Sequence, residues 1–525
     1  MPVRLDHMLA DACARFGSQE ALDDGTRRLT FRELAQDADR LHAELKAAGH
    51  EPGRPVLVAV SNRAEDLVCH FAAWKARAAV VPVHRNSPVA AVVTTARRTG
   101  ARLLLGAPPH HPPAWDAFTP LPAPGRTEPA RTDPARPSAA WLRLSQGGTS
   151  PAALQDFAPP EELDGDQALV VFTSGSTGQP KGVVLSHAAF AGKLAAIQEV
   201  LPFSPGSRTT QVLQLNFSFA QWTALLTLAH GGSLRLLPRF DAERVLEVLG
   251  SSRTDRIAMV PSMLRLLARA LDASAAPREL LAERVSPGLI IAGGEPLSAG
   301  LGRRLRELLP HTGLADVYGL SETSTSDFIL TPEAYDEGAG TIGTPSPQVS
   351  FRVADEQGEE CPAGETGDLW IRTPYVMTGY LGDPRETRAA FTDGWLRTGD
   401  LARLRPGDKL VELGGRTKQL ISRGGIKISP LEIENCYASH PACTECLAVG
   451  VPDPDLGERT HLLVVRGSRP VPPRGELRAW GRERLEPYKL PDQVHTVDEL
   501  PLGRTGKADR LAARELALRL AGGAP

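Results

Sequence analysis

The sequence predicts an α/β fold: a large N-terminal domain of layered parallel sheets and helices with a β-rich subdomain, and a small α+β C-terminal domain. Short apolar runs alternate with helical patterns over roughly the first 300 residues, as in a parallel sheet covered by helices. From about residue 341, short β-like runs are separated by turns that contain glycine. The 525 residues exceed what one core usually holds, and the chain beyond Gly414 has its own strand and helix pattern. We therefore expect a large domain over residues 1–414 and a small one over residues 415–525.

The N-terminal region is predicted to begin with an amphipathic helix and to continue as a βαβ unit. Apolar residues between positions 5 and 16 recur at helical spacing and are interrupted by acidic residues, which is unlike a signal peptide. Thr30 and Glu33 form a capping box that predicts a helix over residues 34–45. The βαβ unit covers residues 56–60, 66–75 and 78–83. We expect a cytoplasmic protein.

The middle of the chain contains a variable connection followed by further alternation of strands and helices. Residues 106–165 are rich in proline, alanine and charge, which predicts an irregular surface segment. The runs expected to form strands cover residues 168–172, 211–215, 233–237, 289–292, 350–354 and 368–372. Helices are expected over residues 187–201 and 299–309. In the small domain we expect a helix over residues 432–439 and strands over residues 447–451 and 493–500.

Composition excludes several classes of partner. Hydrophobic residues make up 42% and charged residues 23% of the chain, and the net charge is -3. This balance gives no electrostatic basis for binding nucleic acid or an anionic membrane. No apolar run approaches the ~20 residues that span a bilayer. Six cysteines in a chain of this length do not form a disulfide framework.

The segment with Cys436, His440, Cys443 and Cys446 has the spacing of a zinc site. However, its first part is predicted to be a helix that ends before Pro441, and Cys446 begins an apolar run. A free cysteine behaves as a small hydrophobic residue. The interpretation as packed cysteines is therefore favoured over zinc.

A loop rich in glycine, hydroxyl groups and one lysine follows the predicted strand at 168–172. Such a loop can direct backbone N–H groups and hydroxyls at a phosphate, with the lysine as counter-charge. The spacing is not that of a P-loop, and a flexible Ser/Gly linker is the alternative. The residues predicted to bind phosphate are Thr173, Ser174, Gly175, Ser176, Thr177, Gly178 and Lys181.

This loop, T-S-G-S-T-G-Q-P-K-G, resembles the phosphate-loop signature of the adenylate-forming superfamily of acyl- and aryl-CoA synthetases, nonribosomal peptide synthetase adenylation domains and luciferases. Later motifs of that superfamily recur in the same order: Y-G-L-S-E-T at 318–323, T-G-D at 398–400, G-R at 415–416 and P-x-x-x-x-G-K-x-x-R at 501–510. The resemblance covers nearly the whole chain. Within the superfamily, the sequence is most similar to the stand-alone enzymes that adenylate aryl acids.

The resemblance implies that the protein binds ATP and Mg²⁺ and joins a carboxylic acid to AMP with release of pyrophosphate. Glu322 matches the magnesium ligand, and Lys507 matches the lysine that bridges the substrate carboxylate and the α-phosphate. We predict Lys507, Thr323 and Glu322 as catalytic residues. The other residues expected at the nucleotide are Gly293, Gly294, Glu295, Tyr318, Gly319, Asp400 and Arg416.

The acyl pocket is expected around residues 216–222, with Gly293 and Gly319 also lining it. Amino-acid-activating members place an Asp where Ser218 stands, so an ammonium group here would lack its counter-charge, which is costly when buried. The segment is similar instead to the Asn-Tyr-Pro-Leu-Ser stretch of hydroxybenzoate-activating enzymes. Asn216 would then bond to a ring hydroxyl or amine, whereas Gln221 departs from the usual small hydroxyl residue. Asn216, Phe217, Ser218 and Gln221 are the predicted pocket residues, with core packing as the alternative for the aromatic ones.

The C-terminal motifs imply a second step. In the family, the small domain rotates about a hinge, Lys507 leaves, and a glycine-containing loop enters to form a thiol channel. Lys418 matches the hinge, and Gly424, Gly425 and Lys427 match the channel. The acceptor is expected to be CoA or the phosphopantetheine of a separate acyl or peptidyl carrier protein. Transfer to an amine or another nucleophile, and a catalytically silent nucleotide-binding homologue, are the alternatives.

Overall fold

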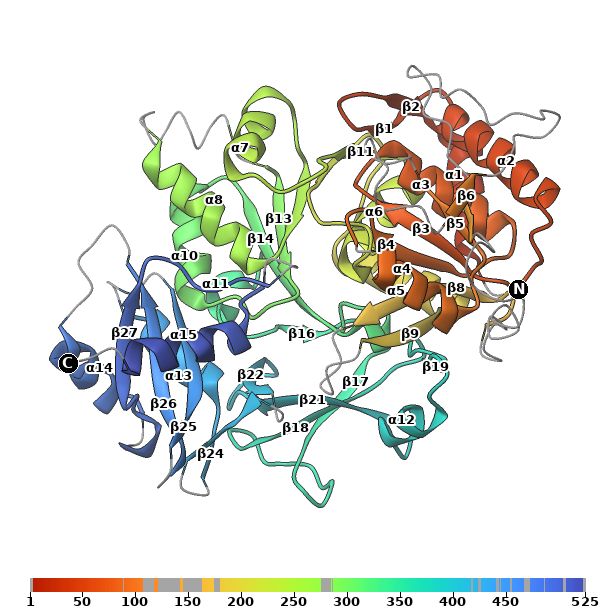
Figure 1. Cartoon of the computed structure of the whole chain (residues 1–525). Helices are drawn as coiled ribbons and strands as arrows, with labels where there is room; N and C mark the ends of the chain where they lie inside the picture. Colours follow the sequence, from red (N-terminus) through yellow and green to blue (C-terminus); the bar gives the residue numbers. More distant parts are fainter. Residues whose placement is uncertain are drawn as a thin grey trace.

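The protein is described by a computed structural model (Figure 1). The described residues are 3–87, 89–106, 118–120, 142–144, 163–173, 180–274, 285, 287–416, 419–423, 426–440, 443, 445–453, 456–466, 473–485, 487–503 and 507–522. The predicted fold class is confirmed, because layered sheets and helices make up the larger part and a smaller α+β unit lies at the C-terminus.

One large sheet has a parallel centre and antiparallel edges, in the order β16-β15-β14-β13-β12-β10-β11-β1-β2. Its strands from β14 through β1 are parallel to their neighbours in this order. The strands are β1 (Glu20–Asp23), β2 (Arg28–Thr30), β10 (Arg208–Gln211), β11 (Ser233–Leu236), β12 (Arg256–Met259), β13 (Leu289–Gly293), β14 (Gly313–Tyr318), β15 (Phe328–Leu330) and β16 (Thr344–Pro345).

A second sheet contains the predicted N-terminal βαβ unit and has the order β19-β9-β8-β4-β3-β5-β7-β6. Its parallel strands are β8, β4, β3 and β5. Its members are β3 (Val56–Val60), β4 (Val80–His84), β5 (Leu103–Leu105), β6 (Phe118–Pro120), β7 (Leu142–Leu144), β8 (Gln167–Thr173), β9 (Lys181–Ser186) and β19 (Gly379–Tyr380). β6 and β7 form a short antiparallel pair within the segment predicted to be irregular.

The remaining strands form the β-rich subdomain and the C-terminal sheet. The subdomain contains β17 (Ser350–Ala354), β18 (Thr366–Arg372), β20 (Phe391–Thr392), β21 (Trp395–Leu404) and β22 (Val411–Arg416), with β21 paired to β18, β20 and β22. The C-terminal sheet contains β23 (Ile421–Arg423), β24 (Ile426–Ile428), β25 (Cys446–Asp453), β26 (Gly457–Val465) and β27 (Gln493–Val497).

The helices lie between the strands as the sequence pattern predicts. Their bounds in the N-terminal half are α1 (Leu5–Phe16), α2 (Phe31–Ala47), α3 (Ala64–Lys75), α4 (Val89–Thr99), α5 (His187–Val200), α6 (Ser218–Ala229), α7 (Ala242–Ser251) and α8 (Pro261–Ala273). Those that follow are α10 (Ala299–Leu308), η3 (Ser321–Thr323), α11 (Tyr335–Gly338), α12 (Pro384–Ala389), α13 (Pro430–Ala438), α14 (Arg474–Arg482), η5 (Pro487–Lys489) and α15 (Arg510–Gly522).

The capping box at Thr30 is confirmed, because Thr30 Oγ1 accepts from Glu33 N and the Glu33 carboxylate accepts from Thr30 N at 2.8 Å. The core is apolar on both sides of the large sheets: β3 is buried at every position, and Trp74 and Trp222 are among the largest fully buried side chains. Helices and strands therefore form where the apolar periodicity demands burial.

The prediction of a strand over residues 211–215 is wrong. β10 ends at Gln211, and the chain then leaves the sheet and runs into α6. The backbone of this connection bonds to side chains instead of a neighbouring strand: Asn62 Nδ2 donates to Leu213 O at 2.9 Å, and Leu215 N donates to Asn62 Oδ1 at 3.2 Å. A continuous apolar run in the sequence does not by itself distinguish a strand from a buried loop.

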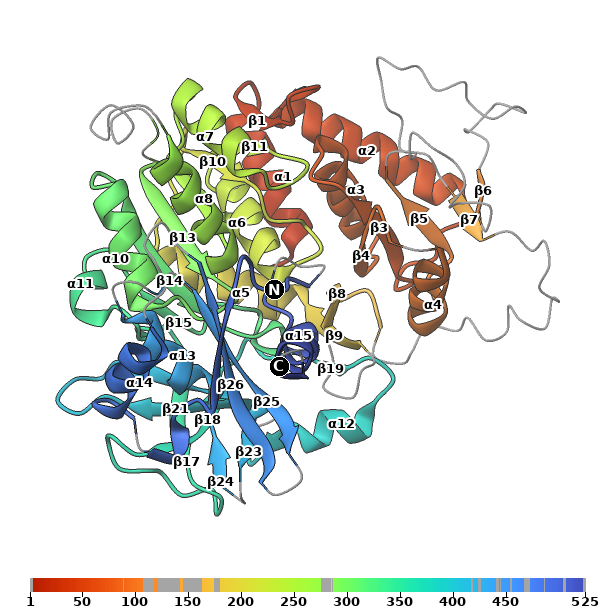
Figure 2. The same ribbon diagram turned by 60° about the vertical axis from the view of Figure 1, so that its left-hand side comes forward.

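Both views place the C-terminal sheet, α13 and α14 below α10 and α11 (Figures 1 and 2). Arg269 of α8 forms an ion pair with Glu445, which precedes β25. A Cβ atom on Gly300 of α10 would lie 3.0 Å from Ala438 O of α13. This close approach brings the C-terminal residues to the edge where β13 and β14 end.

Candidate active site

The strands that flank the predicted phosphate loop pair with each other in antiparallel register, with Thr173 opposite Lys181. The five loop residues from Ser174 to Gly178 that were predicted to bind phosphate lie outside the described residues. Lys181 forms an ion pair with Glu386 of α12, and Lys181 Nζ lies 4.9 Å from the centre of the Tyr380 ring. A carboxylate and an aromatic face therefore surround the lysine at the base of the loop.

Glu322 lies in η3, a 3₁₀ helix of one turn that follows β14 after a short connection. The Tyr380 hydroxyl donates to Glu322 Oε1 at 2.9 Å. Burial, and then the charge of Glu322, raise the pKa of the Tyr380 phenol, so it remains a donor near neutral pH. Because the Tyr380 ring also faces Lys181, this tyrosine joins the predicted phosphate residue to the predicted magnesium ligand.

Thr323, the last residue of η3, is fully buried. Its hydroxyl contacts Asp327, and Asp327 Oδ1 lies 2.8 Å from Lys193 Nζ in an ion pair whose two side chains are both 0% exposed. Burial raises the pKa of the Asp327 carboxyl, and Lys193 opposes that shift. Glu322 and Thr323 are thus adjacent in sequence but face different surroundings.

The two residues predicted to hold the nucleoside lie together. Tyr318 ends β14, Asp400 lies in β21, and the Tyr318 hydroxyl donates to Asp400 Oδ2 at 2.6 Å. A Cβ atom on Gly319 would lie 2.1 Å from Ser326 N, so only glycine allows the chain to fold back here. An aromatic ring and a carboxylate therefore meet at the carboxyl end of a parallel strand, which is where open α/β sheets bind ligands.

Lys507 reaches this same edge from the C-terminal unit. Lys507 Nζ donates to Gly294 O at 2.7 Å, and Gly294 follows β13 with a φ of +82°. The neighbouring Glu295 accepts a hydrogen bond from Ser262 N at 3.2 Å. Burial raises the pKa of the Glu295 carboxyl, while Arg265 and Lys507 lower it. The structure thus brings together the residue ranges 293–295, 318–323 and 507, which are far apart in the sequence.

The predicted acyl segment lies against Gly293. A Cβ atom on Gly293 would lie 3.2 Å from Phe219 Cε1 and 2.6 Å from Val317 Cγ2. Phe219 stacks on Trp222 with ring centroids 5.6 Å apart, which is core packing within α6. Gln221 Nε2 donates to Leu215 O at 2.7 Å.

Two amide oxygens of this segment are buried and have no hydrogen-bond partner among the described residues: Asn216 Oδ1 and Gln221 Oε1. Buried polar atoms are normally satisfied, so each such atom calls for an explanation. Both are acceptors, and they belong to the stretch predicted to meet the acid.

Arg416, which is predicted at the nucleotide, and the residues predicted for the hinge and thiol channel are described only in part. The backbone of Arg416 ends β22 and pairs with Asp400 in β21. The backbone of Lys427 pairs with Ser422 in the hairpin of β23 and β24. Lys418, Gly424 and Gly425 lie outside the described residues.

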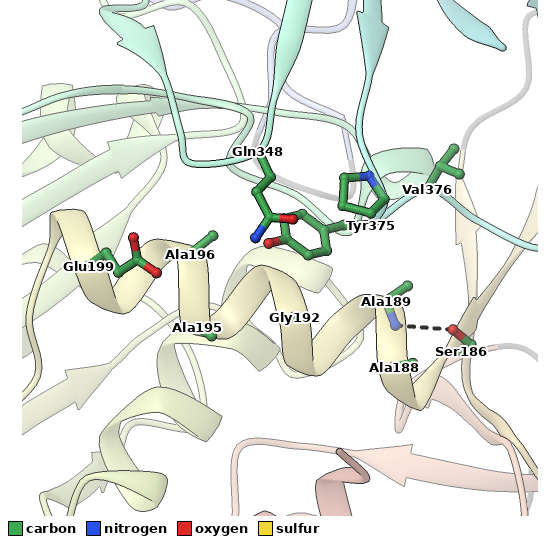
Figure 3. Close-up of a pocket in the computed structure, with 11 residues that line it drawn as sticks. Ser186, Ala188, Ala189, Gly192, Ala195, Ala196, Glu199, Gln348, Tyr375 and Val376 are labelled. Atoms are coloured by element: carbon green, nitrogen blue, oxygen red, sulfur yellow. Dashed lines mark hydrogen bonds between the residues drawn. The ribbon is translucent and has the colours of Figure 1, made fainter. Parts of the chain in front are cut away.

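A surface cavity of about 490 Å³ lies apart from these residues, between α5 and residues 374–376 (Figure 3). Small side chains of α5 form its floor, and the Tyr375 ring lies across Gly192. None of the predicted site residues lines it.

Sequence reasoning missed Tyr380, Glu386 and Asp327. Tyr380 and Glu386 lie in the stretch G-Y-L-G-D-P-R-E, in which Asp383 accepts from Glu386 N at the start of α12. An N-cap Asp followed by Pro marks a helix start, but nothing local shows that the neighbouring tyrosine faces a lysine on another strand.

Family models match most of the chain. The model described as AMP-binding enzyme matches residues 9–381, and the model described as AMP-binding enzyme C-terminal domain matches residues 432–507. The chain belongs to the AMP-binding enzyme family. The predictions of an adenylate-forming superfamily member, and of a ligase that uses ATP, are therefore confirmed.

Curated relatives support this assignment. A feruloyl-CoA synthase of an Amycolatopsis species is 32% identical over 490 residues, which cover 93% of this chain and 94% of the relative. A salicylyl-CoA synthase / salicylate adenylyltransferase of a Streptomyces species is 31% identical over 520 residues, covering 95% and 91%. A 2,3-dihydroxybenzoate-AMP ligase of Bacillus subtilis is 29% identical over 522 residues, covering 97% and 92%.

Solved structures share the fold over nearly the whole chain. An anthranilate CoA ligase in complex with anthranoyl-AMP has a TM-score of 0.81 at 22% identity and covers 99% of this chain and 98% of its own. A benzoate CoA ligase from Burkholderia xenovorans LB400 has a TM-score of 0.79 at 22% identity, covering 98% and 100%. Both confirm the predicted architecture of a large α/β part with a smaller C-terminal part.

Two further observations concern metals and membranes. Within the described part of the chain, no group of three or more His, Cys, Asp or Glu side chains is arranged to hold a metal ion. Cys446 Sγ donates instead to Glu434 O at 3.3 Å, and His440 packs edge-on against Trp480 with ring centroids 4.8 Å apart. No helix among the described residues has both the length and the apolar character needed to cross a bilayer.

Proposed function

We propose that this chain activates an aromatic carboxylic acid with Mg²⁺ and ATP to an acyl-AMP, releases pyrophosphate, and then transfers the acyl group to a thiol. The observation that carries the proposal is the hydrogen bond from Lys507 Nζ to Gly294 O at 2.7 Å. This bond holds a cation beside the end of β13, where Gly293 packs against Phe219 of the predicted acyl segment, and this proximity supports the proposal. A positioned ammonium there offsets the negative charge that develops as carboxylate and α-phosphate approach.

The nucleotide would be held by groups that already contact one another. Tyr318 supplies a flat face for adenine, and Asp400 supplies acceptors for the ribose hydroxyls. ATP binding would exchange the hydrogen bond between their side chains for bonds to the nucleoside. Thr173 and Lys181, with the loop between them, would meet the β- and γ-phosphates, and Arg416 would reach the ribose or phosphate.

Glu322 fits a magnesium site of the kind that ATP brings with it. Magnesium usually keeps only one or two protein carboxylates together with water and phosphate oxygens. Glu322 is partly exposed, and among the described residues its carboxylate accepts a hydrogen bond from Tyr380 through Oε1, which leaves acceptor capacity on that carboxylate. Bound there, the ion would offset phosphate charge during the displacement.

The acid is proposed to be aromatic and to carry a hydrogen-bond donor on its ring. Asn216 Oδ1 and Gln221 Oε1 are acceptors left without partners among the described residues, and a ring hydroxyl or amine would satisfy them. Ser218 cannot provide the counter-charge for the ammonium of an α-amino acid. The named substrates of the relatives, ferulate, salicylate and dihydroxybenzoate, are hydroxylated aryl acids and support the same class.

The thiol step is proposed to use a rotation of residues 415–525 about Lys418. Lys507 would leave Gly294, and the segment with Gly424, Gly425 and Lys427 would then line the path of the thiol. The acceptor would be CoA or the phosphopantetheine of a separate carrier protein, as the names of the relatives include both kinds of ligase.

Pyrophosphate exchange into ATP tests the substrate class. We expect the highest kcat/KM for benzoates and cinnamates with a ring hydroxyl or amine, lower values for the unsubstituted acids, and no exchange with ordinary α-amino acids. Asn216→Leu and Gln221→Leu should reduce the advantage of the hydroxylated over the unsubstituted acid, because the acceptor oxygen is lost. A preference for an α-amino acid, or an unchanged ratio in both variants, would overturn the assignment.

A further inference from the structure

A fully buried ion pair contacts the residue that follows the proposed magnesium ligand in the sequence. Lys193 projects from α5, and its Nζ lies 2.8 Å from Asp327 Oδ1, with both side chains 0% exposed. The other carboxylate oxygen of Asp327 accepts from the Thr323 hydroxyl. Asp327 therefore ties a helix of one sheet layer to the turn that carries Glu322.

The chain between Thr323 and Asp327 has an unusual backbone. Ser324, Thr325 and Ser326 have φ values of 58°, 75° and 45°, and all three are buried. Left-handed conformations are unfavourable for residues with a Cβ atom, and three in succession persist only where surrounding contacts enforce them. The contacts that enforce this turn are therefore part of what fixes the position of Glu322.

Those contacts converge from several elements. Ser324 Oγ donates to Tyr375 O at 2.7 Å, and Met377 N donates to Glu322 O at 2.7 Å. Ser346 Oγ donates to Ser326 O at 3.0 Å. These hydrogen bonds are neutral, whereas the bond between Lys193 and Asp327 is charge-assisted and sits at the end of the turn.

The aromatic ring of Tyr375 covers the ion pair. Lys193 Nζ lies 5.2 Å from the centre of this ring, and the ring packs so closely on α5 that a Cβ atom on Gly192 would lie 2.6 Å from Tyr375 Cε1 (Figure 3). Tyr375 also lines the surface cavity beside α5, whereas neither Lys193 nor Asp327 does. Both side chains are fully buried, and electrostatic attraction is stronger in a protein interior than in water.

We propose that Lys193 and Asp327 are positioning residues, which hold the turn at residues 321–327 in the shape that presents Glu322 to the metal and phosphates. The proposal rests on the proposed function, because it assumes that Glu322 acts in adenylation. A general stabilising role is the alternative, but a buried ion pair is often no more stabilising than apolar residues of similar volume. The location of the Lys193–Asp327 pair at the end of a strained turn favours a role in fixing the shape of that turn.

The decisive variant replaces both charges at once. Lys193→Met together with Asp327→Asn leaves no unpaired buried charge, and the Asn oxygen can still accept from the Thr323 hydroxyl. Thr323→Val is the milder variant, because it separates the turn from Asp327 and leaves the ion pair intact. Leu41→Ala is the matched control: this residue is buried in α2, which packs on α1 and α3, and its truncation leaves a cavity in the core.

Hydrogen exchange of the ligand-free protein is measured first. The peptide that covers residues 319–327 should exchange faster in the double variant and in Thr323→Val, but at the wild-type rate in Leu41→Ala. Pyrophosphate exchange with a hydroxybenzoate is measured second. We expect kcat for adenylation to fall by about 10²-fold in the double variant, as misplacement of a catalytic group can cause, with little change in the KM of the acid.

The outcomes separate the two proposals. Wild-type protection and wild-type kcat in the double variant and in Thr323→Val would overturn the positioning role. Equal loss of protection across the whole chain, matched by Leu41→Ala, would also overturn it in favour of general stability. If the wild-type protein exchanges no pyrophosphate with any acid, the proposed function fails, while the hydrogen-exchange result still decides whether the pair holds the turn.

Discussion

Asn62 provides a quantitative test of how the acyl segment is held. This residue follows β3, is fully buried and has a φ of 55°. Its Nδ2 donates to Leu213 O at 2.9 Å and to Leu237 O at 3.1 Å, and its Oδ1 accepts from Leu215 N at 3.2 Å. One side chain from the second sheet thus fixes the loop that leads to Asn216.

The cost of Asn62→Ala follows from which groups lose their partners. Leu213 O keeps a hydrogen bond from Gln211 Nε2 at 2.8 Å, so it remains satisfied. Leu215 N and Leu237 O lose the side chain that bonds to them, and each unsatisfied buried group costs about 1–3 kcal/mol. We therefore expect a loss of about 2–6 kcal/mol in the free energy of unfolding of this region.

Two measurements check this value. The urea midpoint, followed by tryptophan fluorescence, should fall, and the peptide that contains Leu215 should lose protection from hydrogen exchange by about 30-fold or more. The KM of the acid should rise because Asn216 is no longer held. Gln348→Ala is the control, since Gln348 also has a positive φ, of 61°, but is exposed, so this substitution removes no buried side chain. A wild-type midpoint and wild-type protection in Asn62→Ala would refute the reasoning.

Three other changes test the site and the fold. Glu386→Gln should lower the KM of Mg·ATP by no more than about fivefold, because the carboxylate competes with phosphate for Lys181 and partly exposed ion pairs are worth about 0.2–1 kcal/mol; a raised KM would contradict this. Lys507→Ala should slow acyl-AMP formation by about 10²–10³-fold, whereas supplied acyl-AMP should react with the thiol at a near-native rate; equal loss in both half-reactions would contradict the assignment. Burial lowers the pKa of His187 from 6.5 to about 3, so the unfolded chain binds a proton at this residue at a higher pH than the folded protein does. The free energy of unfolding is therefore unaffected by this residue above pH 6.5 and decreases below it, by at most about 1.4 kcal/mol per pH unit. His187→Asn should flatten the decline of the urea midpoint between pH 6.5 and 4.

Features encoded over short distances were predictable from the sequence. The capping box at Thr30 involves residues three apart, and the apolar runs that became β3, β8 and β13 are buried at nearly every position. Tyr318 and Asp400 are 82 residues apart, and a shared place at the nucleotide could be predicted only because both belong to recognisable motifs; the direct hydrogen bond between them was not predicted.

Contacts between distant residues outside such motifs were not predictable. Lys193 and Asp327 are 134 residues apart, and Tyr380 and Glu322 are 58 apart. A lysine in a helical pattern is expected at the surface, because burial of its charge is costly unless a partner compensates it. The partner is known only once the sheets are assembled. The same holds for residues 211–215, where Asn62 takes the place of a neighbouring strand.

A single turnover with enzyme in excess over ATP shows directly whether this protein adenylates an aryl acid. Enzyme, Mg·ATP and a hydroxybenzoate are mixed, quenched with acid and analysed by mass spectrometry, first without and then with a thiol acceptor. We expect aryl-AMP and pyrophosphate in equal amounts before the thiol is added, and AMP with the thioester afterwards. Formation of ADP and phosphate, or no consumption of ATP with any aryl acid, would contradict it.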